Sequence, residues 1–130
     1  MVLLKHKLIS GITLLILDGL WISLFMGPRY TTMIKKIQKS NMIINYSLVF
    51  LAYLFMVLGL YTFVLPNINV KSKKIDDSLK FGFLFGIILF GVYDFTAGAL
   101  LKDWNIPLSI LDVLWGGILY FLSSYIIKLF

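Results

Sequence analysis

The sequence predicts an all-α membrane protein, in which four transmembrane helices with short loops form one bundle. Two observations carry this prediction. Of the 130 residues, 60% are hydrophobic, against roughly 45–50% in an average soluble domain. The chain also holds four apolar runs that approach or exceed the roughly 20 residues needed to cross a hydrocarbon core, at residues 8–26, 42–65, 81–101 and 106–127. Little chain is left over, so we expect a single transmembrane domain over residues 1–130.

The first apolar run follows a basic start, Lys5-His6-Lys7, as the apolar part of a signal peptide does. The run contains Asp18, however, and no small-residue cleavage pattern follows it, so we predict an uncleaved first helix. After it, Pro28 suits a first helical turn, and apolar residues recur at helical spacing among basic ones over residues 27–41. This segment fits a short amphipathic helix lying on the membrane surface. A solvated basic loop fits it equally well.

The middle of the chain carries signals for a polar face, a cap and a close helix contact. Tyrosines recur every seven to eight residues in the second run and place hydroxyl groups on one face: Tyr46, Tyr53 and Tyr61. Asp77 or Ser78 is a candidate cap for the third helix. Gly82 and Gly86 are four residues apart, a spacing that lets membrane helices approach closely. The connection of residues 102–105 is so short that the third and fourth spans must be antiparallel neighbours.

The net charge of +6 comes from basic residues in the short segments beside the apolar runs. Lys and Arg normally flank membrane spans, so we expect contacts with membrane lipids and no nucleic-acid partner. The two termini and residues 66–80 together hold seven Lys and Arg residues, whereas residues 27–41 and 102–105 hold five. This small excess favours both termini inside. Abundant Ile and Lys suit an AT-rich genome, which points to a bacterial plasma membrane or to a viral or host membrane.

Several kinds of site are excluded by residues that the chain lacks. There is no cysteine, so disulfides, thiolate nucleophiles and Cys-based metal sites are ruled out. The one histidine, His6, lies outside the apolar runs, which excludes a His-rich iron or zinc centre. No Lys or Arg lies well inside a run, so a retinal Schiff base has no anchor. We therefore expect no metal, no cofactor and no catalytic residue.

Three aspartates, Asp18, Asp94 and Asp112, interrupt the apolar runs. A charge at the centre of a spanning helix costs about 2.5–3.5 kcal/mol, so such residues usually face the bundle interior and mark a pathway or a site. By helical rise, Asp94 and Asp112 lie at nearly the same depth and Asp18 about one turn deeper. We predict that the three share one pocket, within a protomer or across a dimer, where they bind a proton or a cation. The alternative is that protonated aspartates only join helices by hydrogen bonds.

Two of the aspartates have matching neighbours, because residues 17–21 read LDGLW and residues 111–115 read LDVLW. Trp21 and Trp115 each follow an aspartate by three residues, which places ring and carboxyl group on one helix face. The first and fourth spans run in opposite directions, so both rings are expected between the two carboxyl levels, as two walls of one narrow passage. Three further residues are expected to position the aspartates: Tyr93, Thr96 and Ser109. Aromatic residues nearer the span ends are assigned to an interfacial belt: Tyr30, Trp104 and Tyr125.

Together these segments resemble a family of small predicted membrane proteins catalogued as domain of unknown function 2177. The resemblance runs along most of the chain and rests on four segments: Leu17-Asp18 with Trp21, Tyr93-Asp94-Phe95-Thr96, Lys102-Asp103-Trp104, and Asp112 with Trp115-Gly116. One departure is Ala97, where the family pattern has an asparagine. The resemblance implies a four-helix membrane protein and supplies no established activity.

The buried aspartates favour a proton or cation channel, or a carrier that exchanges protons for another solute, with a proton or small cation as its partner. By analogy with small multidrug carriers, which have four short helices and a buried acid in the first, we expect a homo-oligomer and favour a dimer. One alternative is a membrane-embedded lipid-modifying enzyme, or a partner of one, with the aspartates as acid and base. The other is a structural assembly protein, in which the acids only fix helix register. Catalysis is less favoured than transport, because the chain lacks histidine and a richer acidic motif for holding metal.

Overall fold

The computed structural model describes residues 1–130 and is helical, with no strand. The four apolar runs form four helices long and apolar enough to cross a membrane: Leu4–Gln38, Tyr46–Asn67, Ser78–Leu100 and Ile106–Leu129. The predicted all-α fold class with four spans is confirmed. The predicted ends of the second, third and fourth spans lie within four residues of the observed helix ends.

Each long helix changes its winding along its length. The first consists of α1 (Leu4–Trp21), the π-helical turn η1 (Ile22–Met26) and α2 (Gly27–Gln38). The second consists of α3 (Tyr46–Gly59), the π-helical η2 (Leu60–Val64) and the 3-10 turn η3 (Leu65–Asn67). The third and fourth consist of the π-helical η4 (Ser78–Phe83) with α4 (Leu84–Leu100), and of α5 (Ile106–Tyr125) with the 3-10 turn η5 (Ile126–Leu129).

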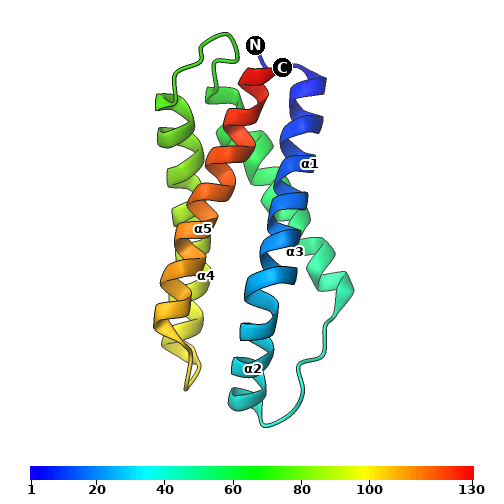
Figure 1. Ribbon diagram of the computed structural model, residues 1–130, viewed down its shortest axis with the longest axis vertical. Coiled ribbons are helices and arrows are strands. Elements are labelled where there is room, and N and C mark those ends of the chain that lie inside the picture. Colours follow the sequence, from blue (N-terminus) through cyan, green and yellow to red (C-terminus); the bar gives the residue numbers. More distant parts are fainter.

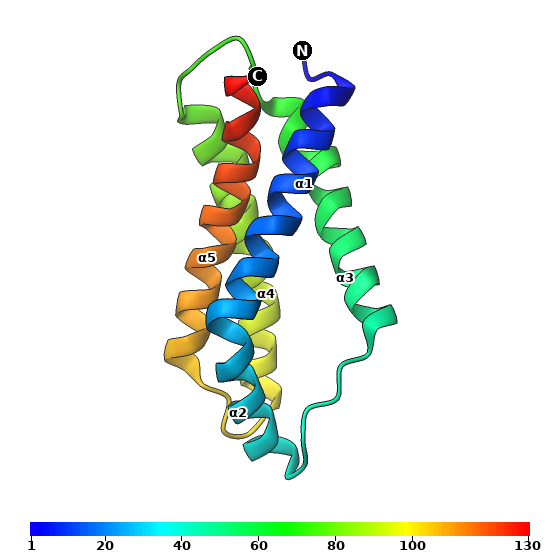
Figure 2. The same ribbon diagram turned by 45° about the vertical axis from the view of Figure 1, so that its right-hand side comes forward.

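Successive long helices run in opposite directions (Figures 1 and 2). Both termini and the loop between η3 and η4 lie at one end of the bundle, which we call the terminal end. The end of α2 and the loop between α4 and α5 lie at the opposite end, which we call the far end. The two termini therefore share one side of a membrane that the bundle spans, and the expectation that this side is the inside stays a prediction.

The segment after the first span is helical, so the solvated loop expected here is wrong. Helix α2 bends relative to α1, as Figure 2 shows, but still runs on toward the far end. That it lies on the membrane surface stays a prediction. The wider π-helical winding of η1 lets the helix continue past Pro28, which lacks an N–H donor. Gly27 suits this turn, because an added β-carbon would lie 2.5 Å from the carbonyl oxygen of Ile22. The helix ends before Lys39, which adopts a left-handed conformation with a φ of 63°.

Helices α4 and α5 form the closest pair, through glycines on both. At Gly86 an added β-carbon would lie 1.9 Å from the carbonyl oxygen of Gly116, so the two backbones approach without side chains between them. At Gly82 it would lie 2.7 Å from the carbonyl oxygen of Tyr120. The predicted close approach at these glycines is confirmed. Helix α5 is the central helix, since 50% of its most apolar segment is buried inside the bundle, against 22% or less for the other three long helices.

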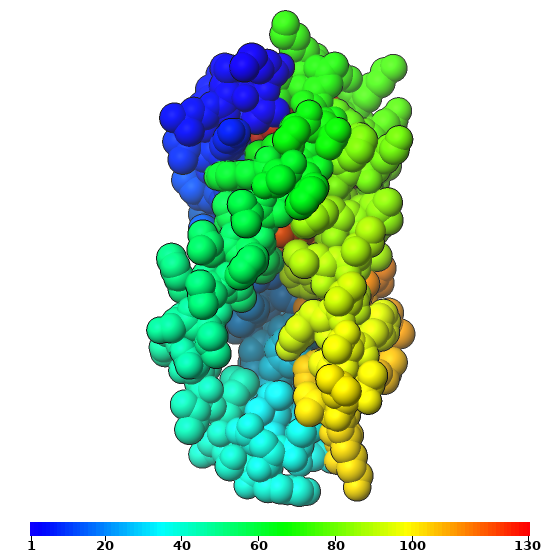
Figure 3. Space-filling model, turned by 180° about the vertical axis from the view of Figure 1, so that it is seen from behind, coloured from blue at the N-terminus to red at the C-terminus, as the bar shows by residue number.

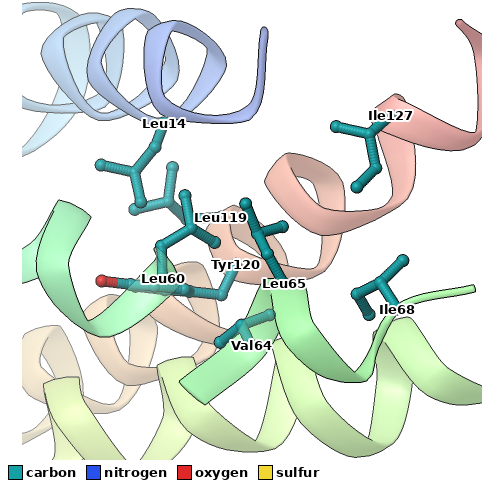
Figure 4. Close-up of a cluster of buried hydrophobic side chains, with 8 residues drawn as sticks. All are labelled: Leu14, Leu60, Val64, Leu65, Ile68, Leu119, Tyr120 and Ile127. Carbon is teal, nitrogen blue, oxygen red and sulfur yellow. The ribbon is translucent and has the colours of Figure 1, made fainter. Parts of the chain in front are cut away.

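The main apolar core is formed by segments that lie toward the terminal end in Figure 1, and Figure 4 shows its side chains. It joins α1, the end of the second helix and α5, through Leu14, Leu60, Val64, Leu65, Ile68, Leu119, Tyr120 and Ile127. Helix α3, in contrast, has no buried residue before Gly59. It diverges from the other helices toward the far end, as Figure 2 shows. The bundle is therefore closed near the termini and open along one side farther down.

One buried lysine anchors the C-terminal turn to the loop before η4. The ammonium group of Lys128, 2% exposed, donates to the carbonyl oxygens of Asn69 and Ser72 at 2.9 Å each. It also lies 3.0 and 3.1 Å from the two carboxylate oxygens of Asp77. Asp77 accepts a hydrogen bond from the backbone N–H of Ser78 at 2.8 Å, which confirms the predicted cap of the third helix. Polar contacts thus hold the terminal end together beside the apolar core.

Candidate functional site

Helices α1 and α5 exchange hydrogen bonds between their tryptophans and aspartates. The indole N–H of Trp21 donates to Oδ1 of Asp112 at 3.3 Å, and that of Trp115 donates to Oδ1 of Asp18 at 3.0 Å. The two rings stack, with centroids 4.8 Å apart and planes 10° from parallel. Each aspartate is bound by the tryptophan of the other helix, because Trp follows Asp by almost one turn on two antiparallel helices. This is the arrangement expected of two walls of one site.

Asp18 has both carboxylate oxygens bonded. Besides the indole of Trp115 on α5, it accepts a hydrogen bond from the hydroxyl of Tyr53 on α3, at an O–O distance of 2.6 Å. Three helices therefore meet at this carboxyl group. Tyr53 belongs to the tyrosine face predicted for the second span, but the other two members lie elsewhere. Tyr61 donates to a backbone carbonyl of α1, and Tyr46 is exposed.

Asp94 on α4 and Asp112 on α5 meet at the hydroxyl of Tyr30, which belongs to α2. The phenolic oxygen lies 3.2 Å from Oδ2 of Asp112 and 3.5 Å from Oδ1 of Asp94. A phenol has one hydrogen to donate, so Tyr30 cannot serve both carboxylates at once. The other carboxylate oxygen of Asp94, Oδ2, is buried and has no hydrogen-bond partner. This pair of acids is short of donors, whereas Asp18 is not.

The three other residues expected to position the aspartates take different places. Ser109 is buried beside Asp94, and its hydroxyl accepts a hydrogen bond from the indole N–H of Trp104 at 2.6 Å. Tyr93 makes no hydrogen bond to an aspartate, and its ring meets that of Trp104 edge-on with centroids 6.3 Å apart. Thr96 is exposed on α4 and lines a separate hollow that includes none of the three aspartates. The place of Ser109 fits a positioning role, and that of Thr96 does not.

A cavity of about 370 Å³ lies beside the aspartate network and opens between α3 and α4. Figure 3 shows the hollow from behind, with α1 at its floor. Nine of its eleven lining residues are hydrophobic, and Asp18 and Asp112 are the only charged ones. The walls include Ala52 and Phe55 of α3 and Leu89 and Phe90 of α4. The site is therefore reached through an apolar opening in the side of the bundle.

A family model described as Predicted membrane protein (DUF2177) matches residues 3–128, nearly the whole chain. The chain belongs to this family. The match confirms the resemblance drawn from the short segments around Asp18, Asp94 and Asp112, and its description agrees with the four long apolar helices. That description names no activity. No curated protein and no solved structure matches the chain.

The three aspartates of this DUF2177 chain form a line of contacts and not a compact cluster. Asp18 and Asp112 are joined through the tryptophan pair, and Asp112 and Asp94 through Tyr30. No group of three or more His, Cys, Asp or Glu side chains is placed to hold a metal ion. Asp18 and Asp112 line the side cavity, whereas Asp94 does not. Ala97, the departure from the family pattern, lies in the separate hollow of α4, outside this line.

Tyr30 and Trp104 contact the aspartate network, although the sequence suggested only an interfacial belt for them. Trp104 is 8% exposed and holds Ser109, while Tyr30 contacts two of the aspartates. Tyr30 follows Asp18 by twelve residues, which in a regular α-helix would leave it about a third of a turn away. The wider winding of η1 turns α2 and brings Tyr30 toward the site. A π-helical turn has no reliable sequence pattern, and Gly27 before Pro28 was the only hint.

Proposed function

We propose that the protein is a proton-coupled carrier, in which Asp94 and Asp112 share a proton or small cation and Asp18 is a second binding position. The observation that carries this proposal is the shortage of donors at Tyr30. Two buried carboxyl groups meet at one phenolic hydrogen, and one carboxylate oxygen is left without a partner. A proton or a cation bound between them supplies the missing positive charge.

Two ionised carboxylates are unstable in this place without such a partner. Like charges 4 Å apart repel by about 4 kcal/mol at an effective dielectric constant of 20, and an unsatisfied buried group costs a further ~1–3 kcal/mol. The hydrogen bonds at Asp94 and Asp112 come from Tyr30 and Trp21, neither of which carries a positive charge. Loss of the bound proton or cation therefore raises the energy of the site and favours the uptake of a replacement.

The tryptophan pair favours a carrier over an open channel. The rings of Trp21 and Trp115 stack between Asp112 and Asp18, and Phe25 stacks on the other face of Trp21 with centroids 4.6 Å apart. Such spacings correspond to rings in contact, which leave no space for water between them. An ion or proton passes from one aspartate position to the other when the rings separate, and such a hydrophobic constriction can serve as a gate.

The substitution Asp94→Asn tests this proposal, because it keeps the shape of the side chain and removes the ionisable proton. The purified protein is placed in liposomes that contain a pH-sensitive dye, and a potassium diffusion potential is applied. We expect the wild type to carry protons faster than protein-free liposomes. The Asp94→Asn variant should fold and show flux lower by about tenfold or more, because the shared proton site is lost.

The exposed loop residue Asp76 supplies the matched control. Asp76→Asn removes one aspartate far from the network in sequence and should leave the flux at the wild-type level. Normal flux in Asp18→Asn, Asp94→Asn and Asp112→Asn alike would reject the carrier. The aspartates would then act only as hydrogen-bonding groups between helices.

One observation favours a lipid-modifying enzyme as the second candidate. The cavity between α3 and α4 lets a molecule approach Asp18 and Asp112 from the side of the bundle, where bilayer lipids lie. The two carboxyl groups would then act as acid and base on a lipid head group. Mass spectrometry of the lipids from the same liposomes distinguishes the candidates. A modified lipid that appears with the wild type and not with Asp112→Asn would support the enzyme.

A further inference from the structure

The side cavity has the walls of a binding site for an amphipathic organic cation. We infer that it takes a molecule with one permanent or protonated amine and an alkyl or aryl body. The cationic head lies against Asp18 and Asp112, and the body lies between α3 and α4. This inference rests on the proposed function and names the class of solute that would exchange with protons.

The size and lining of the cavity fit such a molecule. Its volume of about 370 Å³ falls within the roughly 300–1,000 Å³ typical of small-molecule sites, which are mostly apolar with a few polar groups. Five aromatic side chains line it: Trp21, Tyr30, Phe55, Phe90 and Tyr93. A cation placed over the face of such a ring is attracted by about 0.5–2 kcal/mol. A hydrated metal ion would gain no favourable contact with these apolar walls.

Charge selects a cation over the other molecules that enter bilayers. Asp18 and Asp112 are 4% and 5% exposed, so each still touches the cavity, and no Lys or Arg lines it. A fatty acid or a phospholipid head group would place its own negative charge against these carboxylates. A neutral alkyl chain would fill the walls and leave the carboxylates without a positive charge to balance them. A lone amine on an apolar body satisfies both parts of the cavity.

The opening faces the direction from which an amphipathic amine arrives. Helix α3 has no buried residue before Gly59, and the hollow lies between this part of α3 and α4 (Figure 3). In a bundle that spans a membrane, this opening lies at the depth of the lipid chains. Amphipathic amines partition into that region. Asp94 does not line the cavity and has a buried unpartnered oxygen, so it remains available to hold the proton of the exchange.

The test uses the chain's own tryptophans, two of which lie at the site. N-octylpyridinium carries a permanent positive charge, and its ring quenches indole fluorescence. We expect saturable quenching of the purified protein in lipid nanodiscs, reversed by decylammonium and not by decyl sulfate. Equal reversal by the anionic and cationic competitors, or quenching that never saturates, would mean simple partition into lipid and would overturn the inference.

Substitutions separate the cavity from the proton site. Ala52→Phe fills the cavity wall and should weaken the apparent affinity for N-octylpyridinium by about tenfold or more. Ala99→Phe adds the same ring at an exposed position of α4 outside the cavity, and should bind as the wild type does. Affinity that is the same in Ala52→Phe and Ala99→Phe would overturn the inference, and would leave the cavity to an acyl chain or a second copy of the protein.

The two proposals fail in different ways. Asp112→Asn should lose pyridinium affinity, whereas Asp94→Asn should retain it while losing proton flux, because Asp94 does not line the cavity. Proton flux without selective pyridinium binding would reject the organic cation and keep the carrier. Selective binding without proton flux across a gradient of N-octylpyridinium would reject the carrier and keep a cation-binding site. Folding of every variant is checked by size-exclusion chromatography and circular dichroism.

Discussion

At the scale of single residues, the repeated LDxLW segments work as a reciprocal pair. Each tryptophan has two roles: its N–H binds the aspartate of the opposite helix, and its ring stacks on its counterpart. The hydrogen bonds keep the carboxyl groups of Asp18 and Asp112 in place, and the stacked rings lie between these two groups. Substitutions that remove one role and keep the other can therefore distinguish placement from closure.

The double substitution Trp21→Ala with Trp115→Ala removes both roles. We expect a higher proton leak at low driving force than in the wild type, because the constriction between Asp112 and Asp18 is gone. Trp21→Phe with Trp115→Phe is the matched control, since it keeps two stacked rings and removes the N–H donors. It should keep the leak low. It should also lower the free energy of unfolding by about 1–3 kcal/mol for each donor lost from a buried acceptor.

The leak is measured in the same dye-loaded liposomes. Equal leak in the alanine and phenylalanine pairs would show that the rings do not close the passage. The shared LDxLW sequence would then be a packing feature.

At the scale of secondary-structure elements, the contact between α4 and α5 sets the position of Asp94 relative to Asp112. The two helices touch through glycines, and Gly86 leaves no space for any side chain against Gly116. Because Asp94 lies about two turns after Gly86 and Asp112 about one turn before Gly116, a small separation of the helices moves the two carboxyl groups apart.

The substitution Gly86→Ala places a β-carbon 1.9 Å from the carbonyl oxygen of Gly116, which forces the helices apart. We expect a loss of about 1–3 kcal/mol or more in the free energy of unfolding, as for other overpacked sites. Gly19→Ala is the matched control, because nothing lies within 4 Å of its added β-carbon. It should be neutral or stabilising by about 0.5–1 kcal/mol, the usual gain of Ala over Gly within a helix. Unfolding in a mixed-detergent titration compares the two, and equal stability would contradict the close contact.

The four helices followed from the sequence because their lengths depend on a local quantity. Apolar length fixes the spans, and the rise per residue places Asp94, Asp112 and Asp18 along them. The contribution of Tyr30 could not be predicted, because it depends on a change of winding at η1 that leaves no periodic signal. The exchange of partners between Trp21 and Trp115 also depends on tertiary packing, which spacing within one helix does not contain.

At the scale of the whole molecule, the terminal end is fixed and the far end is open. The apolar core and the buried Lys128 tie the C-terminus, the first helix and the loop before η4 together. Helix α3 leaves the bundle below this region. Any opening of the cavity that leaves the fold intact is therefore expected to pivot near the termini, with the larger displacement at the far end.

The Lys128–Asp77 pair makes the terminal end sensitive to acid. Partial burial raises the pKa of Asp77, but hydrogen bonds from the backbone of Asn69 and from Lys128 outweigh it and hold the pKa below its ordinary value of 3.8. The pairing therefore contributes its full stability above the ordinary value, and this contribution is lost as the pH falls through the lowered pKa.

The backbone N–H of Asn69 donates to Asp77 at 2.8 Å and reports the titration directly. We expect its NMR amide shift in micelles to move with a midpoint below 3.8, with a parallel fall in the protection of the loop. Asp77→Asn should abolish this dependence. A midpoint at or above the ordinary value would contradict the pairing.

The continuous first helix, Leu4–Gln38, carries Asp18, Trp21 and Tyr30 on one element. Asp18 accepts a hydrogen bond from Tyr53. Trp21 donates to Asp112, and Tyr30 contacts both Asp112 and Asp94. A rotation of this helix about its own axis would release all of these contacts in a single step. Asp18 and the Asp94–Asp112 pair would then change state together, without any signal having to travel between them.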